Sequence, residues 1–235
     1  MTIDKQLEIS VSDTIIEKPL RFNVGEHKFN IYPSTLGKNQ LLKNLYLSMH
    51  INEELLTTNP LAETLRISKE NPDAVCRIIA YSTFNDKRSI MDTDKVFHRA
   101  KIFKDHSSTD ELSTLLSVIL SNDRTGELIH YFGIDADKDL KARINRIKGD
   151  GNSITFGGKS IYGLLIDFAC QRYGWTMDYV LWEISYANLT MLSADAITTI
   201  YLTDEERKQL GLGFGQVINA DDPANRDLIR EMISE

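Results

Sequence analysis

The segment from Gly151 to Ser160 comes closest to a motif that performs chemistry. It ends in Gly158-Lys159-Ser160, and Gly-Lys-Ser closes the loop in which backbone amides hold phosphates while the hydroxyl meets magnesium. That loop also needs a glycine five positions before Gly158, where this chain has Ser153. We therefore interpret Gly157-Gly158 as the turn before a helix and expect no nucleotide cofactor.

The histidines and cysteines do not predict a metal site. No two of the five histidines lie three or four residues apart, and neither cysteine has a neighbour at the spacing of a metal ligand. One pair of cysteines cannot form the disulfide framework of a small secreted domain, so we expect free, buried thiols in a reduced, cytoplasmic protein. The residues considered are His27, His50, His98, His106, His130, Cys76 and Cys170.

Four carboxylates in the apolar C-terminal half are the remaining candidates for catalysis: Asp167, Asp178, Glu183 and Asp195. Two such groups can act together as general acid and general base. On amphipathic helices, however, most carboxylates face solvent or cap a neighbouring helix, and no serine lies in a Gly-x-Ser-x-Gly turn. We predict no catalytic residue, and an enzyme is the least favoured class of function.

The stretch from Tyr173 to Leu189 contains both tryptophans of the chain. Trp175, Tyr179, Trp182 and Tyr186 fall along one helical stripe. Such a stripe usually packs in the hydrophobic core, but this one has more apolar surface than a small helical domain needs for its core. Amphipathic aromatic side chains also concentrate binding energy at interfaces, so these four residues are our candidates for binding a partner.

Charge disfavours nucleic acid as a partner. With 34 acidic and 27 basic residues, the chain has a formal net charge of -7. There are two basic clusters, of which the second is nearly neutralised by nearby aspartates and lacks interleaved aromatic residues that would stack on bases. The clusters are Lys95, Arg99, Lys101 and Lys104, then Lys138, Lys141, Arg143, Arg146 and Lys148, the latter beside Asp135, Asp137, Asp139 and Asp150.

Hydrophobic periodicity predicts a mainly α protein with one small sheet. Apolar residues alternate from Leu20 to Tyr32 around Gly25-Glu26, which predicts an antiparallel β-hairpin. Helical spacing and capping residues predict helices in most of the remaining chain. The expected helices cover residues 36–57, 60–69, 72–84, 92–103, 108–120, 160–173, 176–184 and 186–202, with a short polar helix after Thr203.

Composition divides the chain into five parts. Residues 135–153 are polar and contain Gly149-Asp150-Gly151, and the last 33 residues carry eight acids and four bases. No signal peptide or membrane span is expected, because the best apolar run is short and interrupted by Asp167. We predict an N-terminal extension at 1–18, a hairpin plus helical domain at 19–134, a hinge or linker at 135–157, a C-terminal helical module at 158–210 and an acidic tail at 211–235.

Three stretches resemble the tail assembly chaperones of tailed bacteriophages and prophages. They are the hairpin from Phe22 to Tyr32, Pro33-Ser34-Thr35-Leu36-Gly37-Lys38, and the block from Tyr173-Gly174-Trp175-Thr176 to Tyr186. Members of the family are small, helical and often acidic, and a helix after a Gly-Trp-Thr or similar turn is a common feature. This chain is longer than many members, and its N-terminal helices have no clear counterpart in the short ones.

The resemblance implies a non-enzymatic protein of the bacterial host cytoplasm. Such a protein coats the tape-measure protein before the tail tube polymerises around it, and is absent from the finished particle; the tail tube protein is a further candidate partner. A long amphipathic client would aggregate unless a soluble partner covered its apolar stripe, and binding a helix in a groove provides that cover. Two alternatives stay open: a structural virion component, such as a head-to-tail connector or tail-completion subunit, and a DNA-associated phage protein.

Overall fold

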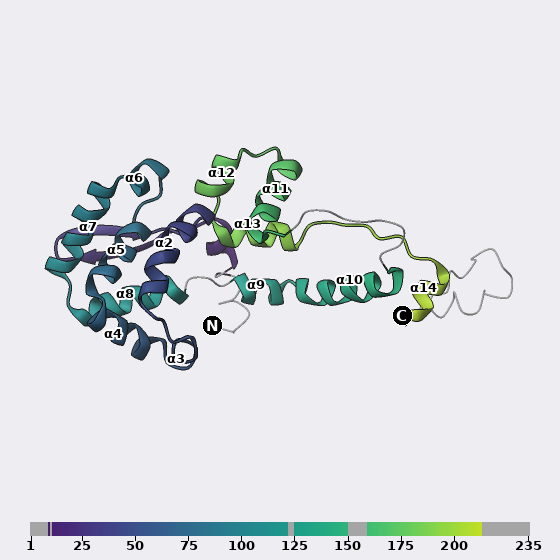
Figure 1. Cartoon of the computed structure of the whole chain (residues 1–235), viewed down its shortest axis with the longest axis horizontal. Helices are drawn as coiled ribbons and strands as arrows, with labels where there is room; N and C mark the ends of the chain where they lie inside the picture. Colours follow the sequence, from purple (N-terminus) through teal and green to yellow (C-terminus); the bar gives the residue numbers. More distant parts are fainter. Residues whose placement is uncertain (1–8, 10, 122–124, 150–158, 213–235) are drawn as a thin grey trace, which may run out of the picture. The chain divides into compact units, whose positions relative to one another are not determined.

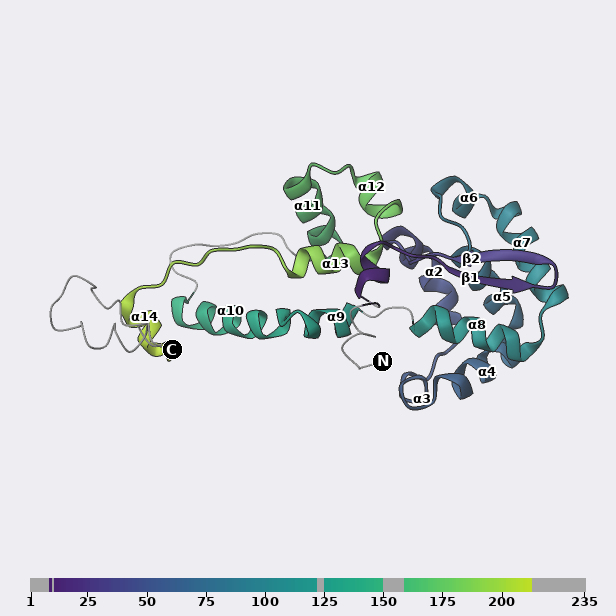
Figure 2. The same cartoon turned by 180° about the vertical axis from the view of Figure 1, so that it is seen from behind.

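The computed structural model describes residues 9, 11–121, 125–149 and 159–212. Within them the fold is mainly α with one two-stranded sheet, which confirms the predicted fold class (Figures 1 and 2). The strands are β1 (Leu20–Val24) and β2 (His27–Ile31). The helices are α2 (Leu36–Ser48), α3 (Glu53–Thr58), α4 (Pro60–Glu70), α5 (Pro72–Ser82), α6 (Lys87–Met91), α7 (Thr93–His106), α8 (Thr109–Ser121), α9 (Thr125–Tyr131), α10 (Ile134–Lys148), α11 (Ile161–Tyr173), α12 (Met177–Trp182), α13 (Tyr186–Ala194) and α14 (Asp204–Gln209).

The predicted hairpin is confirmed. β1 and β2 pair antiparallel, with Leu20 opposite Ile31 and Phe22 opposite Phe29. Gly25 lies in the turn at φ +56°, a conformation that glycine adopts without strain. The rings of Phe22 and Phe29 lie 6.1 and 4.8 Å from the ring of Phe103, so the hairpin packs against α7.

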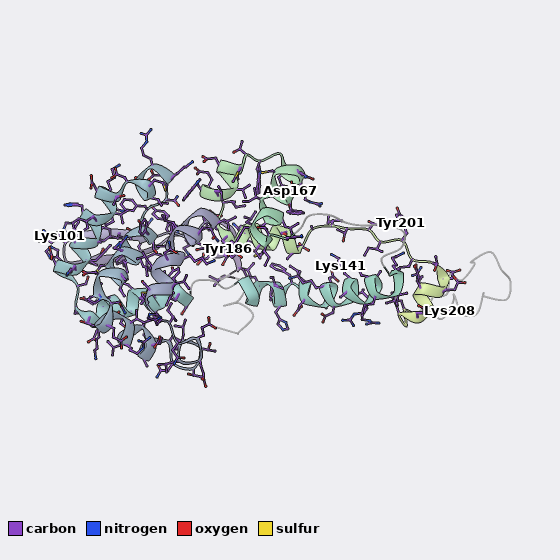
Figure 3. All side chains as sticks on the ribbon, viewed as in Figure 1. Lys101, Lys141, Asp167, Tyr186, Tyr201 and Lys208 are labelled. Atoms are coloured by element: carbon purple, nitrogen blue, oxygen red, sulfur yellow. The ribbon has the colours of Figure 1, made fainter. Side chains whose placement is uncertain are left out.

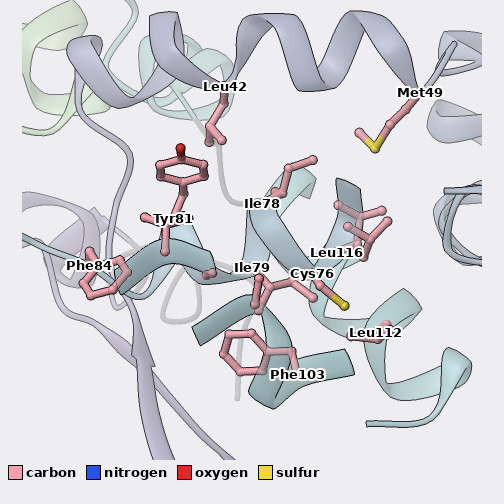
Figure 4. Close-up of a cluster of buried hydrophobic side chains, with 14 of the residues drawn as sticks. Leu42, Met49, Cys76, Ile78, Ile79, Tyr81, Phe84, Phe103, Leu112 and Leu116 are labelled. Carbon is pink, nitrogen blue, oxygen red and sulfur yellow. The ribbon is translucent and has the colours of Figure 1, made fainter. Parts of the chain in front are cut away.

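The central helix of the larger core is α5. It contacts α2, α4, α7 and α8, and Ile78 and Ile79 in its middle are fully buried. Burying one such side chain contributes roughly 1.5 to 3 kcal/mol, so this helix organises the stability of the first half of the chain. Figure 4 shows the cluster around it, with Leu42, Met49, Cys76, Ile78, Ile79, Tyr81, Phe84, Phe103, Leu112 and Leu116 labelled.

Two predicted helices are shorter than the sequence indicates. The prediction of one helix over 36–57 is wrong, because α2 ends before His50, whose φ is +46°, and the side chain of Asn52 then caps α3. The prediction of a helix over 186–202 is also wrong, because α13 ends at Ala194.

The predicted hinge or linker at 135–157 contains a helix, since α10 covers its residues up to Lys148. Asp135 and Asp137 lie in the first turn of α10, and Arg146 and Lys148 lie in the last turn. This order of charges is favourable for the helix dipole. The polar composition that indicated a linker therefore belongs to a helix with a largely polar surface, while residues 150–157 lie outside the described part of the chain.

The described residues form two compact units. The first joins residues up to 134 with residues 159–196, so the N-terminal helices and most of the predicted C-terminal module pack together. The second contains most of α10 with residues 197–212; there Arg143 donates to the Leu210 carbonyl at 2.7 Å, and Lys148 pairs with Glu206 at 3.2 Å. Glu206 also completes the predicted capping box of α14 with Thr203.

Parts of both predicted terminal segments lie outside the described residues. Residues 9 and 11–18 of the N-terminal extension are described, but of the tail at 211–235 only residues 211 and 212 are. Both cysteines are free thiols; Cys76 is buried, whereas Cys170 is only half-buried. None of the helices in the described ranges has the length and apolar character needed to cross a membrane.

Candidate partner-binding site

Two of the stretches that carry the family resemblance pack against each other. The backbone N–H of Tyr186 donates to the carbonyl of Ser34 at 2.7 Å, and Thr35 and Ser185 form an isolated β-bridge. Thr35 and Ser185 are both buried, and each caps the helix that follows it, α2 and α13 respectively. The start of α2 and the start of α13 are therefore held together by backbone hydrogen bonds across about 150 residues of sequence.

Gly37 allows α12 to approach α2 closely. A Cβ at this position would lie 2.8 Å from the carbonyl oxygen of Leu181 and 2.9 Å from ring atoms of Trp182. Real Cβ atoms do not come this near to other heavy atoms, so the indole ring lies directly on the glycine backbone. Trp182 is thus fixed at the α2–α12 contact.

The next residue, Lys38, is a buried lysine. It is 1% exposed, and its Nζ donates to the carbonyl of Phe84, just beyond the end of α5, at 3.0 Å. Burial lowers the pKa of Lys38 to about 8, and among the described residues no carboxylate pairs with it. The α2 turn at Gly37-Lys38 therefore contacts α12 on one side and the end of α5 on the other.

The four aromatic candidates do not form one helical stripe, and that prediction is wrong. Trp175 precedes Thr176, the N-cap of α12, and Tyr186 is the first residue of α13 after a break at residues 183–185. This break matches the gap between the helices predicted at 176–184 and 186–202, and there Ser185 caps α13 and takes part in the bridge to Thr35.

The same four residues divide between two hydrophobic clusters. Trp182 packs at the edge of the large cluster around α5, whereas Trp175 and Tyr186 pack on the smaller cluster around Ala169 and Leu189. Trp175 and Tyr179 have ring centroids 5.1 Å apart, and Tyr179 is 41% exposed. The structure thus places Trp182 at an internal contact and leaves Tyr179 accessible.

A groove of about 1210 Å³ runs beside the α2–α13 junction, and we call it the α2 groove. It is bordered by α2, the N-terminal segment, the base of the hairpin and the first residues of α11 and α13. Of the four aromatic candidates, Tyr186, labelled in Figure 3, is the one that lines it. Three further lining residues, Ile9, Leu47 and Tyr162, are 51%, 64% and 41% exposed. The α2 groove therefore presents large apolar side chains to solvent.

The N-terminal wall of the α2 groove is attached to α13. Glu17 accepts hydrogen bonds from the backbone N–H of Ser185 at 2.8 Å and from the side-chain amide of Asn188 at 3.0 Å. The same amide donates to the carbonyl of Ile15 at 3.1 Å, and Glu17 adopts a positive φ of 54°. A non-glycine residue in this conformation is uncommon, and here its side chain joins the wall to the junction.

The polar residues of the α2 groove carry mixed charge. Lys18 pairs with Asp13 at 2.9 Å, and Lys43, His50 and Glu53 also line the rim. Burial raises the pKa of Tyr46 to about 12, so its hydroxyl stays neutral at pH 7. Apolar walls with a mixed rim suit a peptide or helix better than a small charged substrate.

The candidate catalytic carboxylates have ordinary structural roles, and no hydrogen bond joins any two of them in the described part of the chain. Asp167, labelled on α11 in Figure 3, accepts from Gln171 at 2.8 Å, and Asp178 pairs with Lys87. Glu183 and Asp195 are the C-cap residues of α12 and α13. They do not form an acid–base pair.

The other motifs have structural partners in the described residues. Ser160, at the end of the phosphate-loop-like segment, caps α11 by accepting from the Gly163 N–H at 3.1 Å, while residues 150–158 lie outside the description. No group of three or more metal-ligating side chains occurs among the described residues. In the first basic cluster, Lys95 and Lys104 pair with Asp92 and Asp73.

Sequence reasoning missed most of the α2 groove. Its strongest available signal is Leu47, an apolar residue on the solvent side of α2, together with isolated apolar residues such as Ile9 in the N-terminal segment. Comparisons of the chain with protein-family models, with curated proteins and with solved structures found no match.

Proposed function

We propose that this protein is a non-enzymatic chaperone that binds an amphipathic helical client in the α2 groove and keeps it soluble. The observation that carries the proposal is the accessible apolar wall formed by Ile9, Leu47 and Tyr162. An amphipathic helix buries its apolar stripe in such a groove, which removes the surface through which it would aggregate.

The family resemblance specifies the client. In tail assembly chaperones it is the tape-measure protein, with the tail tube protein as a second candidate partner, and the activity takes place in the cytoplasm of the bacterial host. Two stretches that carry the resemblance meet beside the α2 groove, at Ser34 and Tyr186, which supports this assignment. The net charge of -7 favours solubility of the loaded complex.

The experiment compares two exposed leucines. A helical tape-measure segment is co-expressed with wild-type protein, with Leu47→Arg and with Leu61→Arg, and the soluble fraction of the client is measured. Leu47 lines the α2 groove and is 64% exposed, whereas Leu61 on α4 is 59% exposed and does not line it. Because both side chains are exposed, neither substitution should lower the free energy of unfolding by more than about 0.5 kcal/mol.

Leu47→Arg is expected to lower client solubility, since a guanidinium in the groove cannot be buried without a partner. Leu61→Arg is expected to leave it at the wild-type level. Equal solubility with both variants would contradict binding in the α2 groove, and an insoluble client with wild-type protein would contradict the chaperone function itself.

A further inference from the structure

A second cavity lies at the turn end of the hairpin, away from the α2 groove. It has a volume of about 410 Å³ and lies between the turn end of β2 and α7; we call it the hairpin-tip pocket. Phe29, Phe84 and Ile102 are its apolar lining residues. The α2 groove uses residues at the other end of the hairpin, such as Leu20 and Tyr32, so the two cavities share no lining residue.

Arg99 is held in a fixed orientation in this pocket. Its Nη1 donates to the backbone carbonyl and to the hydroxyl of Thr83 at 3.1 and 3.2 Å. Its guanidinium carbon lies 3.6 Å from the ring centroid of Phe84, a close cation–π contact. The backbone carbonyl of Phe84 accepts a hydrogen bond from Lys38 at 3.0 Å, which anchors the backbone of the residue under the guanidinium. An oriented guanidinium on an apolar surface matches the planar, two-oxygen geometry of a carboxylate.

Further basic residues surround this guanidinium. Lys28 and His27 come from β2, and Lys95 and His98 come from α7, and Asp94 is the one acid in the lining. Asp86, outside the lining, also interacts electrostatically with Arg99 and Lys95. Lys28 has no ion-pair partner among the described residues, and Lys95 has only a long contact of 3.6 Å with Asp92. In a chain with a net charge of -7, this gathering of basic residues gives a local site for anions.

We propose that the hairpin-tip pocket binds an acidic peptide segment of a protein partner, with one carboxylate on Arg99 and an apolar neighbour against Phe29 and Ile102. The combination of a guanidinium with an apolar lining fits a peptide that carries both kinds of side chain. A polyphosphate chain or nucleic acid fits less well, because Asp94 and the negative charge of the whole chain oppose a long polyanion. The site is independent of the α2 groove and of the client proposed for it.

The test uses a fluorescein-labelled peptide of alternating Glu and Ala with one central Phe, and a matched peptide with Gln for every Glu. Fluorescence anisotropy measures binding of each peptide to the full chain. The variants are Lys28→Glu, in the pocket, and Lys101→Glu, on the same helix as Arg99 but outside the pocket (labelled in Figure 3). Both lysines are exposed, and circular dichroism checks that both variants fold.

We expect the Glu peptide to bind and the Gln peptide to bind at least about tenfold more weakly, because hydrogen bonds between a guanidinium and a charged carboxylate are stronger than those to a neutral amide. Lys28→Glu should weaken binding of the Glu peptide by a similar factor, and Lys101→Glu should weaken this binding much less. Equal effects of the two variants, or equal binding of the two peptides, would overturn the proposal. A single-stranded oligonucleotide and unlabelled Glu peptide are also compared as competitors. If the oligonucleotide displaces the labelled Glu peptide at a lower concentration than the unlabelled peptide does, the proposal is overturned in favour of a nucleic-acid site.

Discussion

Gly37 is the residue on which the α2–α12 contact depends. Replacing it by alanine adds a methyl group 2.8 Å from the Leu181 carbonyl oxygen and 2.9 Å from the Trp182 ring. The better helix propensity of alanine stabilises α2 by about 1 kcal/mol, but overpacking costs about 1 to 3 kcal/mol. We expect Gly37→Ala to lower the free energy of unfolding by up to about 2 kcal/mol, as measured by urea denaturation.

The control for this variant is Gly126→Ala. Gly126 lies in α9, and a Cβ there would meet nothing within 4 Å. This change should leave stability unchanged or raise it by up to about 1 kcal/mol. If Gly37→Ala were as stable as Gly126→Ala, the close approach of Trp182 to the α2 backbone would be refuted.

Lys38 makes stability depend on pH in an unusual direction. Burial lowers its pKa to about 8, whereas the unfolded chain has an ordinary lysine pKa of about 10.4. Between these values the unfolded state binds more protons than the folded state, so the contribution of Lys38 to stability rises with pH. Below about pH 8 both states are protonated, and the folded protein bears the full cost of a buried charge.

Comparison with Lys38→Met isolates this contribution. The free energy of unfolding of the wild type, minus that of the variant, should rise by about 2 kcal/mol from pH 7.5 to pH 10. Burial also raises the pKa of Cys76 to about 11 and that of Tyr46 to about 12, but these groups titrate in both proteins and cancel in the difference. A difference that stayed constant over this range would show that Lys38 titrates normally in the folded protein.

At the scale of elements, α12 separates structural from accessible aromatic residues. Trp182→Ala should destabilise the protein by about 3 kcal/mol, because it removes a ring packed on Gly37 and on the large core. Tyr179→Ala should cost less than about 1.5 kcal/mol, because Tyr179 is 41% exposed and mainly loses its contact with Trp175. Thermal unfolding of each variant tests this order.

Client binding is measured on the same alanine variants, with Trp175→Ala and Tyr186→Ala included. At least one of the four should lose about 2 kcal/mol or more of binding at nearly constant stability, and Tyr186 is the one that lines the α2 groove. If every variant that loses the client also unfolds, the four aromatic residues are core, and binding takes place elsewhere.

Local sequence signals predicted the elements well where local chemistry determines them. Ser108 and Glu111 form the expected reciprocal hydrogen bonds before α8, and Pro72 starts α5 as predicted. The failures occur where distant contacts decide. Periodicity predicted the break at Ser185, between helices at 176–184 and 186–202, but no local signal reveals that Ser185 pairs with Thr35.

The candidate site was only partly predictable for the same reason. Tyr186 was identified by residue type, but the groove that it lines exists only once Glu17 and Ser34 attach two distant segments to the start of α13. The hairpin-tip pocket likewise combines β2 with α7. The sequence showed Arg99 only as a member of a basic cluster, whereas tertiary structure places its guanidinium on the ring of Phe84.

In the first compact unit, the two cavities lie at opposite ends of the hairpin. The hairpin contributes Leu20 and Ile31 to the α2 groove and His27 and Lys28 to the hairpin-tip pocket, and packing on Phe103 fixes its position within the first compact unit. The two cavities share no lining residue. The two proposals therefore assign the apolar client and the acidic partner to separate surfaces of the first compact unit.

The proposed function as a tail assembly chaperone predicts in which assemblies the protein is found. A chaperone must release its client when tail tube subunits cover the same apolar surface, so the protein should be present in complexes with the tape-measure protein and absent from finished particles. Quantitative mass spectrometry of purified particles and of assembly complexes from the same lysate tests this. A fixed number of copies retained in every particle would favour a connector or tail-completion subunit. The protein should be recovered with the tape-measure protein but not with finished particles. If Leu47→Arg abolishes this recovery and Leu61→Arg does not, the recovery depends on the α2 groove.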